Sequence, residues 1–344
     1  MPARVRAVPE AGTAQPDHRV PTQGARLQGL QRIAGEAIAL SYIAVIALIA
    51  SVTGAFYVLF PELGALSHDV FTRPGGTWAK APFLLAITPP LAGAIGIMVT
   101  NALPYGLIAV LLVVCGAIAL VIALRSPIAP SISAGLLPLV LGVKSWWYPP
   151  AILFGTSLLA LLSIAWRRYL AEAPSQEADD IDDAIERFPR DWRGLVPLIM
   201  FVIAATLAVE ATGLRFILFP PLVVIGFEMF GHPEICPWAA RPLLLPIACF
   251  LTAAGGLILL NLIGGNPITA ALAMGWGIVV LRIFDLHVPP ALAVALLPMV
   301  MDHPRYAYPF SVATGTLLLT ICFLAWKAWT ARAVQRGLAA PGPD

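Results

Sequence analysis

Apolar residues follow one another along this chain in runs that contain no charged residue. The runs cover residues 37–60, 81–124, 145–166, 242–281 and 306–326. A helix needs about 20 apolar residues to cross a bilayer, so each run accommodates one or two crossings. The pattern predicts one membrane-spanning helix at about 37–60, two within 81–124 (divided by NALPYG), one at 148–166, and four more at about 196–219, 243–284 (two helices) and 306–326.

Two further apolar stretches, at 127–143 and 289–303, are too short to cross a bilayer comfortably and contain a central proline. We expect re-entrant or broken helices there, because freed backbone groups are tolerated only where protein or a water-filled cavity receives them. With four crossings in each half, both chain ends and the central linker lie on one side. If the short stretches cross fully, the count becomes odd and the halves have inverted orientations.

The chain contains an internal repeat with a period of about 160 residues. A shift of 160 aligns residues 130–166 with 290–326 without a gap and gives 13 identities in 37 positions, where apolar composition alone would give roughly four. The predicted fold is therefore an all-α polytopic membrane protein with about eight transmembrane helices, short re-entrant or broken helices, and an internal two-fold repeat. An even count makes the halves parallel repeats, related by an axis along the membrane normal.

Composition and the placement of charge support this interpretation. Hydrophobic residues make up 59% of the chain, charged residues 12%, and the mean hydropathy is +0.85. Thirteen of the 21 Lys and Arg residues lie in the two tails and the linker, so we expect these parts to be cytoplasmic and the protein to lie in the inner or plasma membrane. The predicted organisation is a disordered basic tail (1–35), two membrane repeats (36–167 and 195–328), an acidic linker (168–194) and a C-terminal tail (329–344).

Several kinds of chemistry find no support in the sequence. The four cysteines have no paired spacing, and the acidic run DDIDD (179–183) has no neighbouring His and is typical of a solvated loop. The chain shows no phosphate-binding loop, metal motif or activated serine. We therefore expect no enzyme activity, no metal, no cofactor and no nucleic-acid partner. The lipid bilayer and a small solute are the expected partners, and an oligomer stays open.

Ionisable residues inside a membrane are costly, so each is a candidate for function. Glu210 and Arg215 lie in or near the span 196–219, and Arg282, Asp285 and His287 precede the short stretch 289–303. We assign proton coupling to Glu210, Asp285 and His287, and binding of an anion to Arg215 and Arg282. The alternatives are that Arg215 reaches the membrane interface while Glu210 forms a structural pair, and that the other three cap helix ends.

Prolines precede four runs of small and branched residues. Proline favours the first turn of a helix, and a helix start directed at the protein centre would present free N–H groups to an anion. The predicted binding residues are Pro61, Gly64, Pro130, Ser131, Ser133, Pro220, Pro289 and Pro290, with Arg73 and His232 at the entrance. The alternative is that these prolines only end the preceding spans.

Three segments carry a resemblance to a known family. FPELGALSHDVF (60–71) and FPPLVVIGFEMF (219–230) are similar to the FPPLGA-type segment of the HPP family of integral membrane proteins. HVPPALAVALLP (287–298) resembles the His-Pro-Pro segment for which that family is named. The resemblance implies two such units in tandem, at 37–166 and 196–328, and some family members are linked to nitrite movement across membranes.

The function predicted from these features is a permease for a small solute, an inorganic anion such as nitrite or nitrate, with a binding site between the repeats and coupling to protons. The alternative is a membrane scaffold or sensor without transport, whose acidic linker and basic tail bind partners. A polar cavity between the halves would favour transport, whereas buried ion pairs in a solid bundle would favour a scaffold.

Overall fold

The computed structural model describes residues 23–169, 184 and 192–335, and all regular structure in these ranges is helical. The helices of the first half are α1 (Gln23–Thr53), η1 (Phe56–Val58), α2 (Glu62–Thr72), α3 (Thr77–Lys80), α4 (Pro82–Ala102), α5 (Leu107–Ala123), α6 (Ser131–Leu141) and α7 (Tyr148–Tyr169). Those of the second half are η2 (Trp192–Gly194), α9 (Leu195–Thr212), η3 (Arg215–Leu218), α10 (Pro220–Gly231), α11 (Pro237–Ala240), α12 (Leu244–Ile263), α13 (Pro267–Ile283), α14 (Pro290–Leu296), η4 (Leu297–Val300) and α15 (Ala307–Gln335). The predicted all-α class is confirmed, and the acidic run at 179–183 lies outside the described residues.

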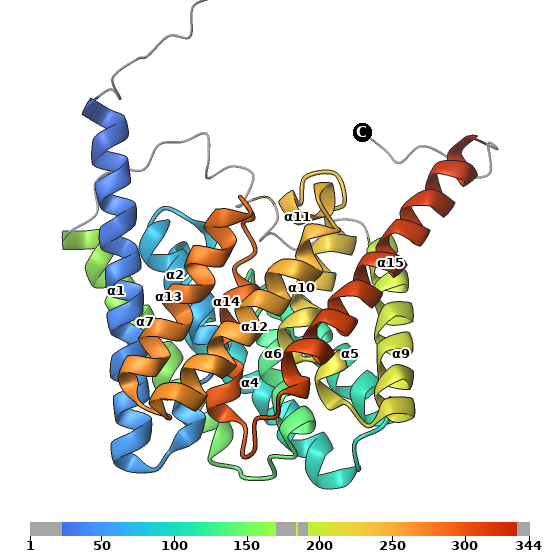
Figure 1. Ribbon diagram of the computed structural model, residues 1–344, viewed down its shortest axis with the longest axis horizontal. Helices are drawn as coiled ribbons and strands as arrows, with labels where there is room; N and C mark the ends of the chain where they lie inside the picture. Colours follow the sequence, from blue (N-terminus) through green and yellow to red (C-terminus); the bar gives the residue numbers. More distant parts are fainter. Residues whose placement is uncertain (1–22, 170–183, 185–191, 336–344) are drawn as a thin grey trace, which may run out of the picture.

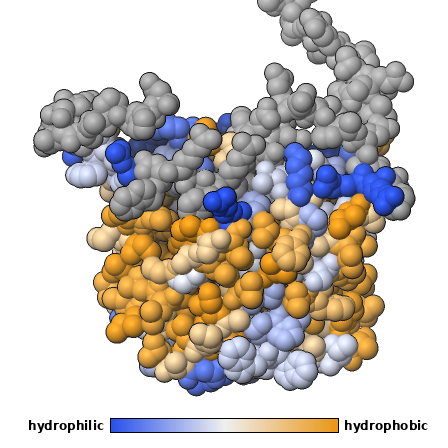
Figure 2. Space-filling view, turned by 180° about the vertical axis from the view of Figure 1, so that it is seen from behind, coloured by the Kyte–Doolittle hydropathy of each residue, from blue (hydrophilic) through white to orange (hydrophobic). Residues whose placement is uncertain are grey.

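The long helices form a bundle suited to a membrane. Among the described residues, six helices are long and apolar enough to cross it, and they are α1, α4, α7, α9, α12 and α15. Helices α5 and α13 have 17 residues each, about 25 Å, which is at the lower limit for a crossing. On the face shown in Figure 2, a broad hydrophobic band covers the body of the bundle, with hydrophilic side chains gathered toward its ends. These helices account for the predicted polytopic membrane protein.

The internal repeat is visible in matching close contacts. A Cβ built on Gly35 would lie 2.3 Å from the Phe71 carbonyl oxygen, and one on Gly194 would lie 2.3 Å from that of Phe230. The hydroxyl of Tyr148 donates to Ala134 O, and that of Tyr308 to Val294 O. Arg125 and Asp285 both have positive φ, of 49° and 50°. Each of these pairs is separated by 159 or 160 residues, as in the sequence repeat.

The two halves interlock, because each contributes its first helices to the other. In the first half α1 packs on α13 and α2 packs on α14 of the second half. The reciprocal contacts join α9 to α5 and α10 to α6, and α10 also touches α14. The short helices α2, α6, α10 and α14 therefore meet where the halves join.

The segment 127–144, which contains α6, runs from one end of α4 to the other. Trp78, just before α4, donates from Nε1 to Pro127 O at 3.0 Å. Asn101, at the last turn of α4, donates from Nδ2 to Lys144 O at 3.0 Å. The re-entrant alternative is therefore wrong for this segment, which crosses the bundle as a broken helix. Its helical part has only 11 residues, because α6 begins after Pro130 and ends at Gly142.

The segment around α2 runs parallel to α7 and opposite in direction to the segment 127–144. Val58 and Leu63 lie against Gly155 near the start of α7, whereas Phe71 O accepts a hydrogen bond from Trp166 Nε1 near its end. The sequence predicted a helix start at Pro61 but no crossing between residues 60 and 81. Each half thus has four long helices and two broken segments that cross, so the number of crossings per half stays even. The odd count expected if the short stretches cross is wrong, because the α2 segment adds a further crossing.

The first and last long helices of the described residues begin and end on the same side of the bundle, as an even count requires. Figure 1 shows the start of α1 and the end of α15 at the same end of the bundle, which we call the termini side. Helix α1 begins at Gln23, so residues 23–35 are helical rather than part of the predicted disordered tail. Leu27, Leu30 and Ile33 recur at helical spacing there, which continues the helix beyond the charge-free run.

Candidate functional site

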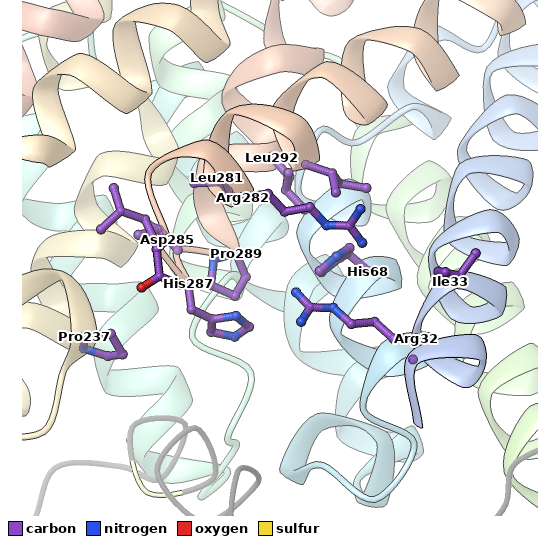
Figure 3. Close-up of a pocket in the computed structure, with 14 residues that line it drawn as sticks. Arg32, Ile33, His68, Pro237, Leu281, Arg282, Asp285, His287, Pro289 and Leu292 are labelled. Atoms are coloured by element: carbon purple, nitrogen blue, oxygen red, sulfur yellow. The ribbon is translucent and has the colours of Figure 1, made fainter. Parts of the chain in front are cut away.

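A cavity of about 760 Å³ opens between the two halves at the termini side. Its wall combines α1 and α2 of the first half with α13 and the start of α14 of the second half. Pro289 lines it just before α14, and Leu292 lines it within α14. Figure 3 shows the side chains of Arg32, His68 and Arg282 pointing toward a common space, with the ring of His287 beside it. The cavity therefore lies where the repeats meet and brings several ionisable side chains together within a largely apolar lining.

Glu36 on α1 organises this cluster and is only 7% exposed. Its Oε1 accepts a hydrogen bond from Arg282 Nη2 at 2.5 Å and lies 3.4 Å from Arg32 Nε and 3.8 Å from His68 Nε2. One carboxylate thus faces two guanidinium groups, which leaves one positive charge before His68 is counted. Because a guanidinium has five N–H donors in a planar fork, donors that do not reach Glu36 are available to an anion in the cavity.

Asp285 contributes little to the balance of charge in the cavity. Its side chain is 90% exposed, and its Oδ2 lies 3.5 Å from Nη1 of Arg241, which is 54% exposed. An ion pair between two exposed side chains is screened by water and has little energy. His287, in contrast, is half-buried and lines the cavity.

The repeat provides an internal comparison for this cluster. At a shift of 159 or 160 residues, Glu36, His68 and Arg282 correspond to apolar residues, namely Leu195, Phe227 and Ile122. Helices α9, α10 and α5 nevertheless occupy the equivalent positions. The fold of a repeat therefore does not require these charges, which makes the cluster a candidate for function.

A second polar group lies at the starts of α2 and α6. Glu62 and Ser133 are each 1% exposed and Ser131 is fully buried. Among the described residues, neither carboxylate oxygen of Glu62 nor the hydroxyl of Ser131 has a hydrogen-bond partner within 3.5 Å, and the Ser133 hydroxyl lies beside Glu62. The corresponding residues of the second half are again apolar, namely Pro221, Ala291 and Ala293.

The structure places Glu210 and Arg215 away from the cavity, at the opposite side of the bundle. Glu210 is exposed, and its Oε1 accepts from the backbone N–H of Leu107 at 3.0 Å, which caps the start of α5. Arg215 lies 5.4 Å from the centre of the Tyr105 ring and points Nη1 at Val140 O, near the end of α6. Burial raises the pKa of Tyr105 to about 12, so its ring is neutral beneath this cation.

The helices that follow the prolines contact one another, α2 with α14, α6 with α10, and α10 with α14. Pro61 and Pro130 precede α2 and α6, Pro220 begins α10, and Pro289 and Pro290 precede and begin α14. All of these prolines are buried, and Ser131 and Ser133 lie in the first turn of α6. Gly64 fills a packing position, since a Cβ there would lie 2.7 Å from Leu296 Cδ1.

Arg73 and His232 occupy equivalent positions at the ends of α2 and α10. Nη1 of Arg73 donates to Asp69 Oδ1 at 2.7 Å, one turn earlier, and both side chains are buried. His232 ends α10, and its backbone N–H donates to Glu228 O. Arg73 therefore closes a buried ion pair with Asp69, and neither residue lines the cavity described above.

Comparison with known proteins finds a family match for the second half of the chain. The family model of the HPP transmembrane region matches residues 192–335. The second half of the chain is similar to the HPP transmembrane region. The predicted family is thereby confirmed, whereas a second HPP unit in the first half stays a prediction. No curated protein and no solved structure matches the chain.

The HPP region supplies only part of the cavity. Arg282, His287 and Pro289 lie within the matched residues, whereas Arg32, Glu36 and His68 belong to the first half. Sequence reasoning missed Glu36 because it precedes a charge-free run. It missed Glu62 and His68 because only Pro61, Gly64 and Arg73 were singled out in their segment. The signal available was the loss of these three charges at the matching positions of the HPP region.

Metal ligands are not grouped in the described part of the chain. No three His, Cys, Asp or Glu side chains there lie close enough to hold a metal ion. The cysteines Cys115, Cys236, Cys249 and Cys322 are free thiols.

Proposed function

We propose that this membrane protein is a permease for a small inorganic anion such as nitrite or nitrate. The observation that carries the proposal is the cavity between the halves, into which Arg32 and Arg282 point. Ionisable side chains within a membrane protein commonly mark a solute or ion pathway. A cavity of this kind at the interface of repeats is also where transporters bind their solutes.

The sign of the charge favours an anion over a cation. Arg32 and Arg282 share the single carboxylate of Glu36, and Asp285 is offset by Arg241. His68 and His287 add positive charge when protonated. An anion approaching from the termini side would therefore meet a net positive surface with free guanidinium donors.

We further propose that the first half is a second HPP-like unit, so that 36–167 and 195–328 are tandem repeats around one pathway. The matching contacts and broken helices of the two halves support this arrangement. The distribution of Lys and Arg supports a cytoplasmic termini side. Anions would then reach the cavity from the cytoplasm.

Of the three residues proposed for proton coupling, Asp285 and His287 line the cavity. His68 joins them because its ring faces the same space (Figure 3). Glu210 lies beyond the other ends of the helices, where it caps α5, so its part in coupling depends on a pathway that continues to that side.

Uptake of labelled nitrite, nitrate and formate into liposomes containing the purified protein tests the proposal. Arg282→Gln should reduce uptake of the transported anion because it removes a donor from the cavity. Arg125→Gln is the matched control, since Arg125 is exposed at the equivalent end of the other repeat and does not line this cavity. Uptake no faster than in empty liposomes for all three anions would reject the permease and favour the scaffold.

A further inference from the structure

Glu62 is a buried carboxylate that the proposed anion cavity leaves unexplained. It begins α2, is 1% exposed, and has no hydrogen-bond partner for either carboxylate oxygen among the described residues. Ser131, at the start of α6, likewise has a buried hydroxyl without a partner, and Ser133 lies beside Glu62. Buried polar groups in proteins are nearly always satisfied, so an unsatisfied set of this kind indicates a missing ligand.

The fold itself does not demand this set. Burying an ionised carboxylate without a counter-charge costs several kcal/mol even after relaxation. The second half builds the same broken helices with Pro221 at the position of Glu62 and with Ala291 and Ala293 at those of the serines. A chain that needed only a packed centre would have apolar residues in both halves.

Among the described residues, no ion pair joins Glu62 to a cation from the elements packed around α2. On α2 itself, Asp69 is paired with Arg73 and His68 faces the cavity. From α1, the Tyr42 hydroxyl donates to Gly155 O and Glu36 faces Arg282; from α7, the Tyr148 hydroxyl donates to Ala134 O. Lys80 on α3 is exposed, and α14 has no titratable side chain. A proton is therefore the simplest neutralising partner.

The cavity ends close to this position. Leu292 of α14 lines the cavity, and a Cβ on Gly64 of α2 would lie 3.9 Å from the Leu292 carbonyl carbon. Gly64 is two residues from Glu62. Glu62 therefore lies within one helical turn of a contact between α2 and the lining of the cavity.

We propose that Glu62, together with Ser131 and Ser133, forms a central site that binds a proton and the transported anion together. This proposal rests on the proposed anion permease and identifies its coupling ion and its occluded site. A proton taken up on one side converts the Glu62 carboxylate to the neutral acid. The anion then accepts hydrogen bonds from that acid and from the serine hydroxyls. Both leave on the other side, Glu62 returns to the carboxylate, and one anion and one proton have crossed without net charge.

Glu62→Gln separates the proton from the anion, because the amide keeps the shape and remains neutral. In liposomes, the variant should still exchange internal nitrate for labelled external nitrate, but it should lose nitrate accumulation driven by an acidic exterior and the accompanying proton uptake. Glu234→Gln is the matched control, since Glu234 is an exposed carboxylate of the second half that does not line the cavity.

Two outcomes would overturn the proposal. One is wild-type accumulation and proton uptake in Glu62→Gln. The other is loss of exchange and accumulation together in a variant that unfolds at the wild-type temperature, which would make Glu62 a binding residue without a proton role. Wild-type protein that moves no anion rejects the permease instead.

A measurement without substrate tests the proton site separately. Infrared difference spectra of the full-length protein between acidic and alkaline buffer should show the C=O band of a buried carboxylic acid. This band should be absent from Glu62→Gln and present in Glu234→Gln. Retention of the band in Glu62→Gln would contradict the assignment even if transport had not been observed.

Discussion

Glu36 and Arg282 should be energetically coupled across the interface of the two halves. Replacing Arg282 by Gln removes a hydrogen bond to a charged group, which is worth about 1.5–3 kcal/mol when fully formed. The Arg282 side chain is 47% exposed, so solvent screening lowers the expected loss in unfolding free energy to about 1–2 kcal/mol. In Arg282→Gln, the Glu36 carboxylate still has Arg32 at 3.4 Å and His68 at 3.8 Å. These contacts limit the free-energy cost of leaving that carboxylate buried.

A double-mutant cycle measures this coupling. Glu36→Gln, Arg282→Gln and the double variant would be unfolded with SDS in mixed micelles and followed by tryptophan fluorescence. The double variant should lose about 1 kcal/mol less than the sum of the single variants, because residues in direct contact are not additive. Arg125→Gln combined with Glu36→Gln is the control and should be additive within about 0.5 kcal/mol. Additivity of Glu36 and Arg282 would refute the ion pair between the halves.

Three further predictions concern the packing and capping that hold the site in place. Gly256→Ala should lower the unfolding free energy by about 1–3 kcal/mol, because the added Cβ would lie 2.1 Å from the Ala295 carbonyl oxygen. Unfolding of this variant at the wild-type SDS midpoint would contradict that contact. Asp69→Ala should cost about 3–5 kcal/mol, since it removes the carboxylate of a buried ion pair with Arg73, and the same titration would detect it. Glu210→Gln should cost about 0.5–2 kcal/mol by weakening the cap on Leu107 N–H, with faster hydrogen exchange confined to the first turn of α5.

The sequence predicted the long helices and the repeat because both depend on local information. Uninterrupted apolar runs specify crossings, and the duplicated segment from Pro130 to Trp166 carried the period. The broken crossing around α2 could not be predicted, because a buried helix of 11 residues satisfies its ends only through tertiary contacts such as Trp166 to Phe71 O.

The candidate site was harder to predict for the same reason. Arg282 was identified from its position at the end of an apolar run, but its partner Glu36 lies 246 residues away in the sequence. Glu210 and Arg215 are close along the chain to an apolar span, yet they lie at the opposite end of the bundle from the cavity. Interlocking of the halves determines which charges meet, and no local pattern encodes it.

The most direct test of the central claim is to obstruct the cavity between the halves. Gly29 lines it, and a Cβ at Gly29 would meet no atom within 4 Å, so Gly29→Cys in a variant without the native cysteines should fold normally. Gly265→Cys, in an exposed loop between α12 and α13, is the control. Modification of Gly29→Cys with a bulky anionic thiol reagent should stop anion uptake and should be slowed by saturating nitrate, whereas modified Gly265→Cys should transport normally. Complete modification of Gly29→Cys with unchanged uptake would contradict a pathway through the cavity.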